Sequence, residues 1–518
     1  MQPPVRLRSL SAFSLLGLAV IGLASISLLA QTGATYYVSK SGSDSNSGSY
    51  TAPWLTIQHA ASAVSAGATV YVEAGVYNES ITFPASGTPS NYITFASYPG
   101  QTAVIDGTGV TCCRNGTQGL INIVNQSYLT VSGFEIRNYT TSSAAGTPAG
   151  IWVTGSGTGV NLLNNLVHNI TTTSEASGNA FGIAVYGTSS TPITNLTISG
   201  NQVYDLKTGQ SESVTVDGNV TYFSVTNNVV HDNDNIGIDL IGFEGVGPAG
   251  HDQAMYGEVS GNTVYNISAI NNPGEGNSYD ADGLYCDGCA YVTFELNTVY
   301  NCDLDMEAAS EHKGHDSSYV TIRDNLFCNA NTVGISIGGY SKNAGGSDHV
   351  VIVNNTFYNN NTQNQGAEFQ IQYNSPASAG NIFENNIVYA GPQNVWIYNH
   401  VSNSSAALNW NLYYSTAGYA RGTSITWGGV SNYRSYAAYQ SSTGEDANSP
   451  NANPLFLSLS SSPPVLDTAS NSPVINAGSA ALSCSVGYCN GSAIYGSSDF
   501  AGNPRTNGGQ IDIGAYEQ

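Results

Sequence analysis

The sequence has 518 residues and a formal net charge of −23. Charged residues make up only 9% of it, whereas it contains 58 Gly and 33 Tyr, a composition typical of a β-rich protein rather than a helical bundle. The negative charge excludes nucleic acid as an expected partner, because phosphate binding requires a basic surface. An anionic polysaccharide is also repelled unless calcium or a local basic patch intervenes, so a neutral glycan is the easier ligand. The alternative interpretation of the acidity is an ordinary solvated surface.

An apolar run from Ala12 to Ala30 follows Arg6 and Arg8. This pattern predicts a signal peptide over residues 1–30, and hence a secreted protein that is extracellular or at the cell surface. An uncleaved anchor is the alternative interpretation, and we expect no other membrane span. The eight cysteines suit an oxidising compartment. We expect local disulfides, Cys286 with Cys289 and Cys484 with Cys489, rather than a redox or metal site.

Residues 54–66 carry apolar side chains at helical spacing and predict one short amphipathic helix. From Gly150 onward, two motifs alternate nine times at intervals of roughly 25 to 36 residues, which is typical of a solenoid with three short strands per coil. The first motif, clearest as G-I-x-V-x-G, predicts a strand with one apolar face; it starts at Gly150, Gly182, Ser213, Gly237, Gly283, Asp303, Gly334, Glu368 and Asn394. The second ends in an Asn that we expect to form a hydrogen-bonded ladder from coil to coil: Asn165, Asn201, Asn228, Asn262, Asn297, Asn325, Asn355, Asn386 and Asn411.

This pattern resembles the right-handed parallel β-helix, the pectate-lyase-like architecture of many secreted carbohydrate-active proteins. The segments YYVSKSGSDSNSGS, VYVEAGVYNESITF and VIDG are similar to the opening of such proteins. The resemblance implies an all-β fold with an N-terminal cap and first coils over 31–110 and a β-helix over 111–450. Residues 451–518 resemble a choice-of-anchor-like C-terminal module, and a simple terminal cap is the alternative. The helix that caps the open end would use Leu55, Ile57, Ala60, Ala61 and Val64.

Aligning 283–288 with 303–308 sets Leu284 beside Leu304 and Asp287 beside Glu307. On neighbouring strands these two residues would project from one face with their Cα atoms about 4.8 Å apart, and one carboxyl group would keep its proton at higher pH. That is the pair that a retaining glycosidase uses. The same outward strip predicts a sugar-binding surface of acids, amides and aromatic rings. Its expected substrate-binding residues, including those just beyond the strands, are Asp239, Tyr285, Asp305, Glu311, His312, Lys313, Gln370, Gln372, Trp396 and Tyr398.

The segments GLYCDG and DMEAASEHKG resemble motifs of β-helix glycoside hydrolases, including a β-xylosidase family. The resemblance implies that Asp287 attacks and that Glu307 protonates the leaving oxygen and then activates water. Glu311 is a rival acid, and Gly288 stands where that family usually has an aromatic residue. We therefore predict a monomeric hydrolase of a polysaccharide or oligosaccharide that needs no metal cofactor.

Two other functions remain open at this stage. A calcium-dependent polysaccharide lyase would use Lys313 or Lys342 as its base, and a non-catalytic glycan-binding solenoid would keep the aromatic residues without a close acid pair. Calcium would find oxygen ligands at Asp232, Asp234, Asp280 and Asp282. A metal is also the alternative interpretation of EHKGHD, which we expect to be a surface turn, through Glu311, His312, His315 and Asp316.

Overall fold

The computed structural model describes residues 33–373, 379–399, 401, 406–461, 463–482, 492–506 and 509–518. The predicted signal peptide and the Cys484–Cys489 pair lie outside these residues. In the described part of the chain, no helix is both long enough and apolar enough to cross a membrane.

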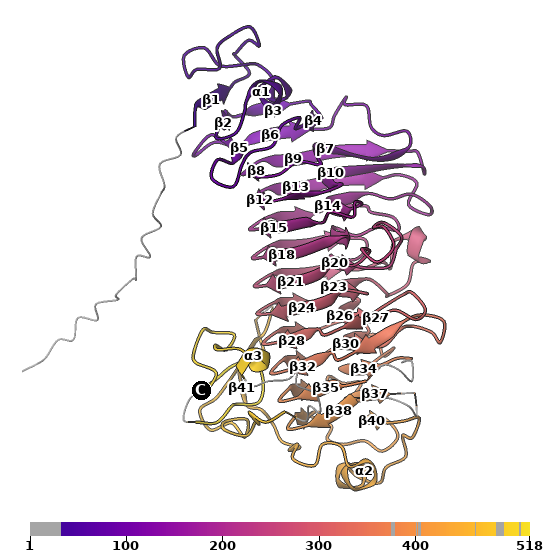
Figure 1. The fold of residues 1–518 in the computed structure, drawn as a ribbon. Helices are drawn as coiled ribbons and strands as arrows, with labels where there is room; N and C mark the ends of the chain where they lie inside the picture. The colour runs from indigo at the N-terminus through magenta and orange to yellow at the C-terminus, as the bar shows by residue number, and fades with distance from the viewer. Residues whose placement is uncertain are drawn as a thin grey trace, which may run out of the picture. The chain divides into compact units, whose positions relative to one another are not determined.

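The described residues form a right-handed parallel β-helix, as predicted, in which successive strands of each coil join three different parallel sheets (Figure 1). The first sheet contains β1 (Thr35–Val38), β2 (Thr69–Val72), β5 (Ile93–Ser97), β8 (Leu129–Ser132), β12 (Val160–Leu163), β15 (Ile193–Ser199), β18 (Val220–Thr226), β21 (Met255–Ser260), β24 (Ala290–Glu295), β28 (Thr321–Arg323), β32 (Val351–Val353), β35 (Asn381–Glu384) and β38 (Ala406–Asn409), with β11 (Gly157–Thr158), β27 (Asp316–Ser318) and β31 (Gly346–Asp348) beside them.

The second sheet carries the G-I-x-V-x-G motifs. It contains β4 (Ile81–Thr82), β7 (Gly116–Val124), β10 (Gly146–Thr154), β14 (Phe181–Gly187), β17 (Val214–Gly218), β20 (Ile238–Ile241), β23 (Asp282–Asp287), β26 (Leu304–Ala309), β30 (Val333–Ile337), β34 (Phe369–Ile371), β37 (Ile397–Asn399) and β40 (Ile425–Thr426).

The third sheet follows the asparagine turns. It contains β3 (Gly75–Tyr77), β6 (Ala103–Asp106), β9 (Glu135–Thr141), β13 (Leu166–Thr172), β16 (Gln202–Tyr204), β19 (Val229–Asn233), β22 (Thr263–Ile267), β25 (Thr298–Tyr300), β29 (Leu326–Cys328), β33 (Thr356–Tyr358), β36 (Ile387–Tyr389) and β39 (Leu412–Tyr414). The remaining elements are an antiparallel pair, β41 (Phe456–Ser458) and β42 (Val465–Thr468), the helices α1 (Ile57–Ala63), α2 (Tyr436–Thr443) and α3 (Ser492–Tyr495), and a 3-10 turn, η1 (Pro273–Glu275).

The inward side chains of the second sheet form a continuous apolar column. Ile183 and Val185 of β14, for example, lie beside Val214 and Val216 of β17, and all four are buried. This alternation matches the prediction for most of the coils. It fails at β26, where Met306 and Ala308 face the core instead of Leu304 and Met306, because the register differs by two residues.

The asparagine ladder predicted from the second motif is confirmed. The nine Asn side chains, from Asn165 to Asn411, are buried one above the other. At each step from Asn165 to Asn386, a side-chain oxygen accepts hydrogen bonds from the backbone N–H and the side-chain amide of the preceding Asn. The ladder therefore satisfies buried polar groups at the same turn of successive coils from Asn165 to Asn411, which an apolar residue is unable to do.

Different elements cover the two ends of the coil. Helix α1 is shorter than the predicted 54–66 and buries Ile57, Ala60 and Ala61 over the first coils. It starts at Ile57 because the Thr56 side chain accepts a hydrogen bond from the His59 N–H and so caps the helix. At the other end, α2 buries Tyr439 against the last coils.

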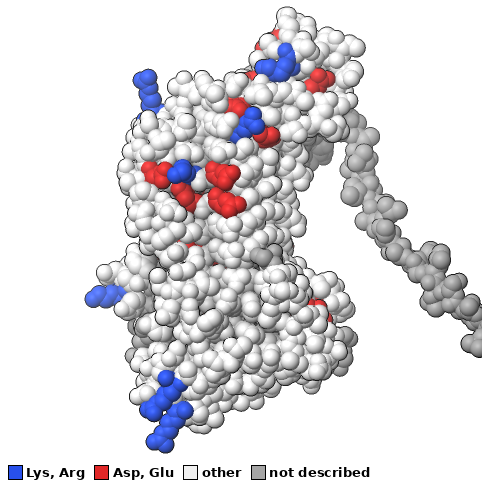
Figure 2. Space-filling model, turned by 180° about the vertical axis from the view of Figure 1, so that it is seen from behind, with Lys and Arg blue, Asp and Glu red and all other residues white. Residues whose placement is uncertain are grey.

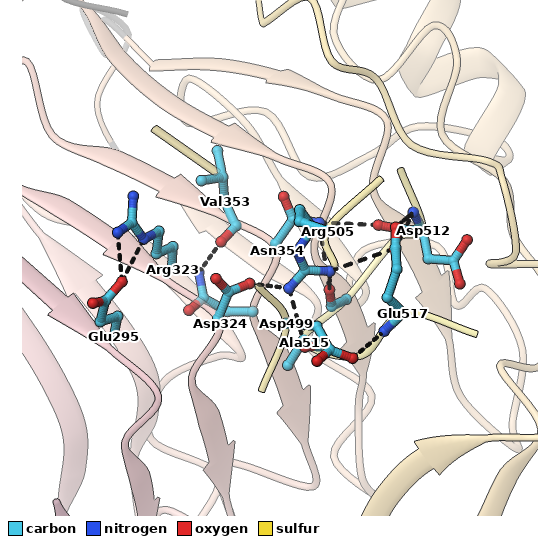
Figure 3. Close-up of polar contacts among 12 residues, drawn as sticks. Glu295, Arg323, Asp324, Val353, Asn354, Asp499, Arg505, Asp512, Ala515 and Glu517 are labelled. Atoms are coloured by element: carbon cyan, nitrogen blue, oxygen red, sulfur yellow. Dashed lines mark hydrogen bonds and ion pairs between the residues drawn. The ribbon is translucent and has the colours of Figure 1, made fainter. Parts of the chain in front are cut away.

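The region after residue 450 packs on the flank of the coils rather than over their end (Figure 1). Leu466 packs with Leu326, Ile494 with Val351, and Ile513 with Leu412. Figure 3 shows the buried Arg505 of this region reaching Asp324, which follows β28. Its guanidinium also donates to the carbonyl oxygens of Gly514 (3.2 Å) and Ala515 (3.0 Å).

The face of the molecule seen in Figure 2 is mostly uncharged, and its few basic side chains are scattered. Several acidic side chains gather in the upper half of this face. The low density of charge elsewhere on it agrees with the low content of charged residues in the sequence.

Replacing an asparagine in the middle of the ladder tests its role. In Asn262→Ala, the N–H and side-chain amide of Asn228 and the Val225 carbonyl all lose a partner. Each orphaned buried group costs about 1 to 3 kcal/mol, so we expect the three together to lower the free energy of unfolding by at least about 3 kcal/mol and to lower the midpoint of thermal unfolding. The control Asn161→Ala removes one half-buried bond, to Thr130, and should change the midpoint little. Equal effects of the two substitutions would contradict the role of the ladder.

Removing the Arg505 charge tests how the C-terminal region is held. Arg505→Met leaves Asp324 buried without its cation, and breaking a buried ion pair costs about 3 to 5 kcal/mol. We expect faster cleavage within 451–518 by a protease under native conditions. The exposed Arg421→Met variant serves as control. Unchanged cleavage of Arg505→Met would show that the apolar contacts alone hold this region.

Candidate functional site

A cleft of about 740 Å³ runs over the outer face of the second sheet, where β17, β20, β23 and β26 lie side by side. No Lys or Arg is among the described residues that line it. Ten carboxylic acids line it instead: Glu212, Asp217, Asp239, Glu244, Glu275, Asp280, Asp282, Asp287, Glu307 and Glu311. Each of these acids that ionises adds negative potential to the cleft, because no side-chain cation in its described wall offsets the charge.

The register of β23 and β26 corrects the predicted acid pair. Asp287 lies opposite Ala309, and Glu307 lies opposite Tyr285, so the two acids are diagonal neighbours rather than direct ones. The correction is a shift of two residues, which keeps both side chains on the outer face. Strand geometry sets their Cα atoms about 8 Å apart instead of about 4.8 Å.

The shift arises at a bend that precedes each inward apolar pair. Gly150, Gly182 and Gly283 occupy the bend in their coils, where an added Cβ would meet core or backbone atoms. Asp305 lies opposite Gly283 and takes this position in β26. The sequence alignment instead placed Asp303 there, because the apolar alternation fits both registers.

Asp305 therefore does not belong to the site that the sequence predicted. Its side chain is 0% exposed, neither carboxyl oxygen has a hydrogen-bond partner in the structure, and burial raises its pKa well above the usual range. Trp396 is a second correction: Ile397, not Val395, pairs with Phe369, so Trp396 turns into the core and stacks on Tyr413 with ring centroids 5.7 Å apart.

Glu307 has the best-defined surroundings of the two predicted catalytic acids. Its Oε1 accepts hydrogen bonds from the Gln372 amide (2.9 Å) and the Ser336 hydroxyl (3.2 Å). Burial raises the pKa of Glu307 to about 7, even though the Ser336 bond lowers it. The group therefore changes its charge near neutral pH.

Asp287 is less exposed than Glu307 and is more strongly disfavoured as an anion. Its side chain is 4% exposed, and its Oδ1 accepts a hydrogen bond from the Glu311 N–H (2.8 Å). Burial, with the nearby charge of Glu311, raises the pKa of Asp287 well above the usual range of an aspartate. A disulfide between Cys286 and Cys289 brackets this residue.

Further acids in the cleft were not predicted as site residues. Glu212 lies just before β17, Asp282 is the first residue of β23, and Asp217 is the last residue but one of β17. Burial raises the pKa of Glu212 and of Asp217 to about 8 each, with Asp217 adding to the effect on Glu212. An acid directly before the first residue of a motif is the sequence signal that would have identified Glu212 and Asp282. Glu244 and Glu275 lie in loops, where no such repeated position exists.

The structure brings six of the predicted residues together in the cleft: Asp239, Tyr285, Asp287, Glu307, Glu311 and Gln372. Lys313 is exposed and does not line it. Gln370 and Tyr398 continue the row of Glu307 on later strands, outside the cleft lining. The four suggested calcium ligands separate into two groups, because Asp232 and Asp234 line a different pocket from Asp280 and Asp282.

The two histidines of the EHKGHD segment also lie apart from each other and make different contacts. His312 Nε2 lies 2.9 Å from Glu244 Oε1 at the edge of the cleft. His315 instead stacks on Phe243, with ring centroids 4.2 Å apart. The only group of metal-ligand type found among the described residues is Glu244, Asp287 and His312, whose ligand atoms lie within 4.8 Å of one another.

Comparison with known proteins relates the chain to β-helix proteins. Residues 36–196 match the family described as "Pel9A-like, right handed beta helix region". The chain is 38% identical over 422 residues to the uncharacterized protein YwoF of Bacillus subtilis (strain 168), covering 81% of this chain and 88% of that protein. The A-module of the mannuronan C-5 epimerase AlgE6 of Azotobacter vinelandii has a TM-score of 0.51 at 13% identity, covering 77% of this chain and 93% of that chain. Pectate lyase Pel9A has a TM-score of 0.45 at 16% identity over 94% of this chain and 98% of that chain. At such identity, the likeness to the epimerase shows a shared fold.

The raised pKa values predict that stability falls as the pH rises. A carboxyl group whose pKa is higher in the folded state binds its proton more tightly there, so it stabilises the fold at low pH and loses this effect as the pH rises through the folded pKa. For Glu212 and Asp217, this window extends from about pH 4 to about 8. We expect the midpoint of thermal unfolding to fall between about pH 5 and about pH 8.

The Glu212→Gln variant should show a smaller fall than the unmodified protein, and the exposed Glu258→Gln should show the same fall. A midpoint that rises over this range, or equal slopes in all three proteins, would contradict the burial of these acids.

Proposed function

Because the chain belongs to the same family as YwoF and carries an acidic cleft on a parallel β-helix, we propose that it is a secreted enzyme that hydrolyses glycosidic bonds. Its substrate would be a neutral polysaccharide or oligosaccharide. The observation that carries the proposal is the cleft itself, in which buried carboxyl groups with raised pKa values line a surface along successive coils.

The cleft has the polar and aromatic groups that sugar binding requires. Carboxyl and amide groups such as Gln372 bond sugar hydroxyls, while aromatic rings stack on the apolar faces of sugars. Tyr186 and Tyr285 line the cleft, and Tyr186 packs with Trp152 at a centroid distance of 4.8 Å. The Trp152–Tyr186 pair offers an aromatic platform on the N-terminal side of the acids.

The charge of the cleft supports a neutral substrate over a uronate. No Lys or Arg is present in the described lining to neutralise a carboxylate substrate. Lys313 and Lys342, the suggested lyase bases, are both exposed and outside the lining. The mannuronan named for the structurally similar epimerase is therefore not the substrate class that we propose.

The hydrogen bonds favour other roles for the two acids than those that the sequence resemblance implied, in which Asp287 attacks and Glu307 donates the proton. Bonds donated to a carboxylate stabilise its charged form, and Glu307 accepts two while Asp287 accepts one. Asp287 is also closer to other acids, which favour its protonated form. We therefore assign Asp287 as the acid that protonates the glycosidic oxygen and Glu307 as the base that takes a proton from water.

The diagonal placement supports attack by water rather than by the enzyme. Inverting glycosidases hold their two carboxyl groups roughly 6.5 to 9.5 Å apart to leave room for a water molecule, and retaining ones about 5 to 5.5 Å. Strand geometry sets the Cα atoms of Asp287 and Glu307 about 8 Å apart. Side chains on one face of a sheet stand roughly perpendicular to it, so we assign their carboxyl groups to the wider range. The sugar released first should therefore have the inverted anomeric configuration.

The first test follows reducing ends, and the absorbance of unsaturated products, on a panel of neutral and uronate polysaccharides. We expect reducing ends from a neutral glycan without that absorbance, and at least a hundredfold lower kcat in Asp287→Asn and Glu307→Gln, because general acid–base groups contribute about 10² to 10⁴. Glu258→Gln should retain full activity. Unsaturated products, or full activity in both acid variants, would overturn the proposal.

The second test separates the two roles. A base with a pKa of about 7 must be ionised to act, so kcat/KM should rise with pH through about 7 and lose this limb in Glu307→Gln. An aryl glycoside with a good leaving group needs no acid, so it should restore activity to Asp287→Asn but not to Glu307→Gln. Restoration in Glu307→Gln alone would reverse the assignment, and a retained anomer by NMR would exclude inversion.

A further inference from the structure

Three potential metal ligands from separate segments of the coil converge at the edge of the cleft. Glu244 follows β20, Asp287 ends β23, and His312 follows β26. Their ligand atoms lie within 4.8 Å of one another, and His312 Nε2 is 2.9 Å from Glu244 Oε1. We propose that Glu244, Asp287 and His312 bind one divalent transition-metal ion of the zinc class.

The ligand types select the class of metal. Imidazole suits zinc, copper and nickel, whereas calcium and magnesium take six or more oxygen ligands. Carboxylate oxygen and imidazole nitrogen are both ligand types that zinc takes, and three protein ligands leave the fourth tetrahedral position open. In the structure, the His312–Glu244 hydrogen bond occupies the space between these donors, and a metal ion would replace it.

A second observation favours cation binding in this part of the cleft. Asp217 is only 2% exposed, and its Oδ1 has no hydrogen-bond partner in the structure. It lies beside Ile241 of β20, and Glu244 is among the charges that act on it. Asp239, opposite Tyr285, likewise has an unpartnered Oδ1. Buried carboxylate oxygens without a donor are costly, and no Lys or Arg in the described lining offsets them.

The site has a consequence for catalysis that rests on the proposed function. Asp287 is both a ligand and the assigned acid. A bound ion coordinates its carboxylate, so Asp287 no longer carries the proton that hydrolysis requires. The ion therefore inhibits hydrolysis reversibly, and a chelator restores activity.

The binding test uses the full-length protein, freed of metal with EDTA, and zinc alone as the probe. Titration calorimetry should give one tight site per chain that weakens at least tenfold in His312→Gln. His315→Gln is the matched control, because His315 lies in the same turn but stacks on Phe243 instead of joining the ligands. Cobalt, which replaces zinc, should give the visible absorption of a four-coordinate site in the unmodified protein and in His315→Gln, but not in His312→Gln.

Three results would overturn the proposal: no zinc binding at micromolar concentrations, equal zinc affinity in His312→Gln and the unmodified protein, or calcium binding that is tighter than zinc binding. Thermal unfolding of each variant without metal checks that it folds.

The inhibition test is separate from the binding test. Zinc should lower hydrolysis of the neutral glycan by the unmodified protein and by His315→Gln, but not by His312→Gln at the same concentration. Calorimetry needs no substrate, so an inactive protein would contradict the hydrolase while leaving the metal site supported. Zinc binding that depends on His312 but does not inhibit hydrolysis would contradict only the claim that the ion blocks Asp287 as the acid.

Discussion

Burial of many carboxyl groups in one cleft, with no cation in its described lining, is the constraint on which the rest of the structure depends. Desolvation and mutual repulsion raise the pKa of Glu212 and Asp217 to about 8 and that of Glu307 to about 7, so these groups compete for protons near neutral pH. Such a site opposes folding at higher pH, and the scaffold must supply stability elsewhere. The apolar column inside the coil and the asparagine ladder do this, because both extend through the coils that carry the cleft and neither includes a residue of the cleft lining.

The same regular scaffold positions the site. Neighbouring parallel strands hold their outward side chains in rows, so Asp239, Tyr285 and Glu307 lie side by side from three coils. Residues that follow the strands add the groups that regular strands do not supply: the Glu311 N–H fixes Asp287, and Gln372 fixes Glu307. In our proposals, hydrolysis and metal binding share Asp287 because it ends a strand where the row of acids meets the loops that carry Glu244 and His312.

The fold followed from the sequence because its signals are repeated in every coil, so one atypical coil changes little. The ladder from Asn165 to Asn411 and the inward pairs such as Ile183 and Val185 are where the motifs placed them. The details of the site did not follow, because alternation has a period of two and leaves a two-residue slip undetected. Only the bend before each inward pair distinguishes the registers, and Asp305 and Trp396 replace its usual glycine in their coils. Glu244 and His312 lie in loops, whose paths no strand pattern determines.

The most direct measurement of the central claim is the protonation of Glu307 itself. Difference infrared spectroscopy between about pH 5 and about pH 9 resolves protonated carboxyl groups from ionised ones, and comparison with Glu307→Gln isolates the signal of this residue. The account predicts a protonated carboxyl signal that disappears with a midpoint near pH 7 and is missing from the variant. A difference signal for Glu307 with a midpoint near 4.5, the ordinary value for a glutamate, would contradict it.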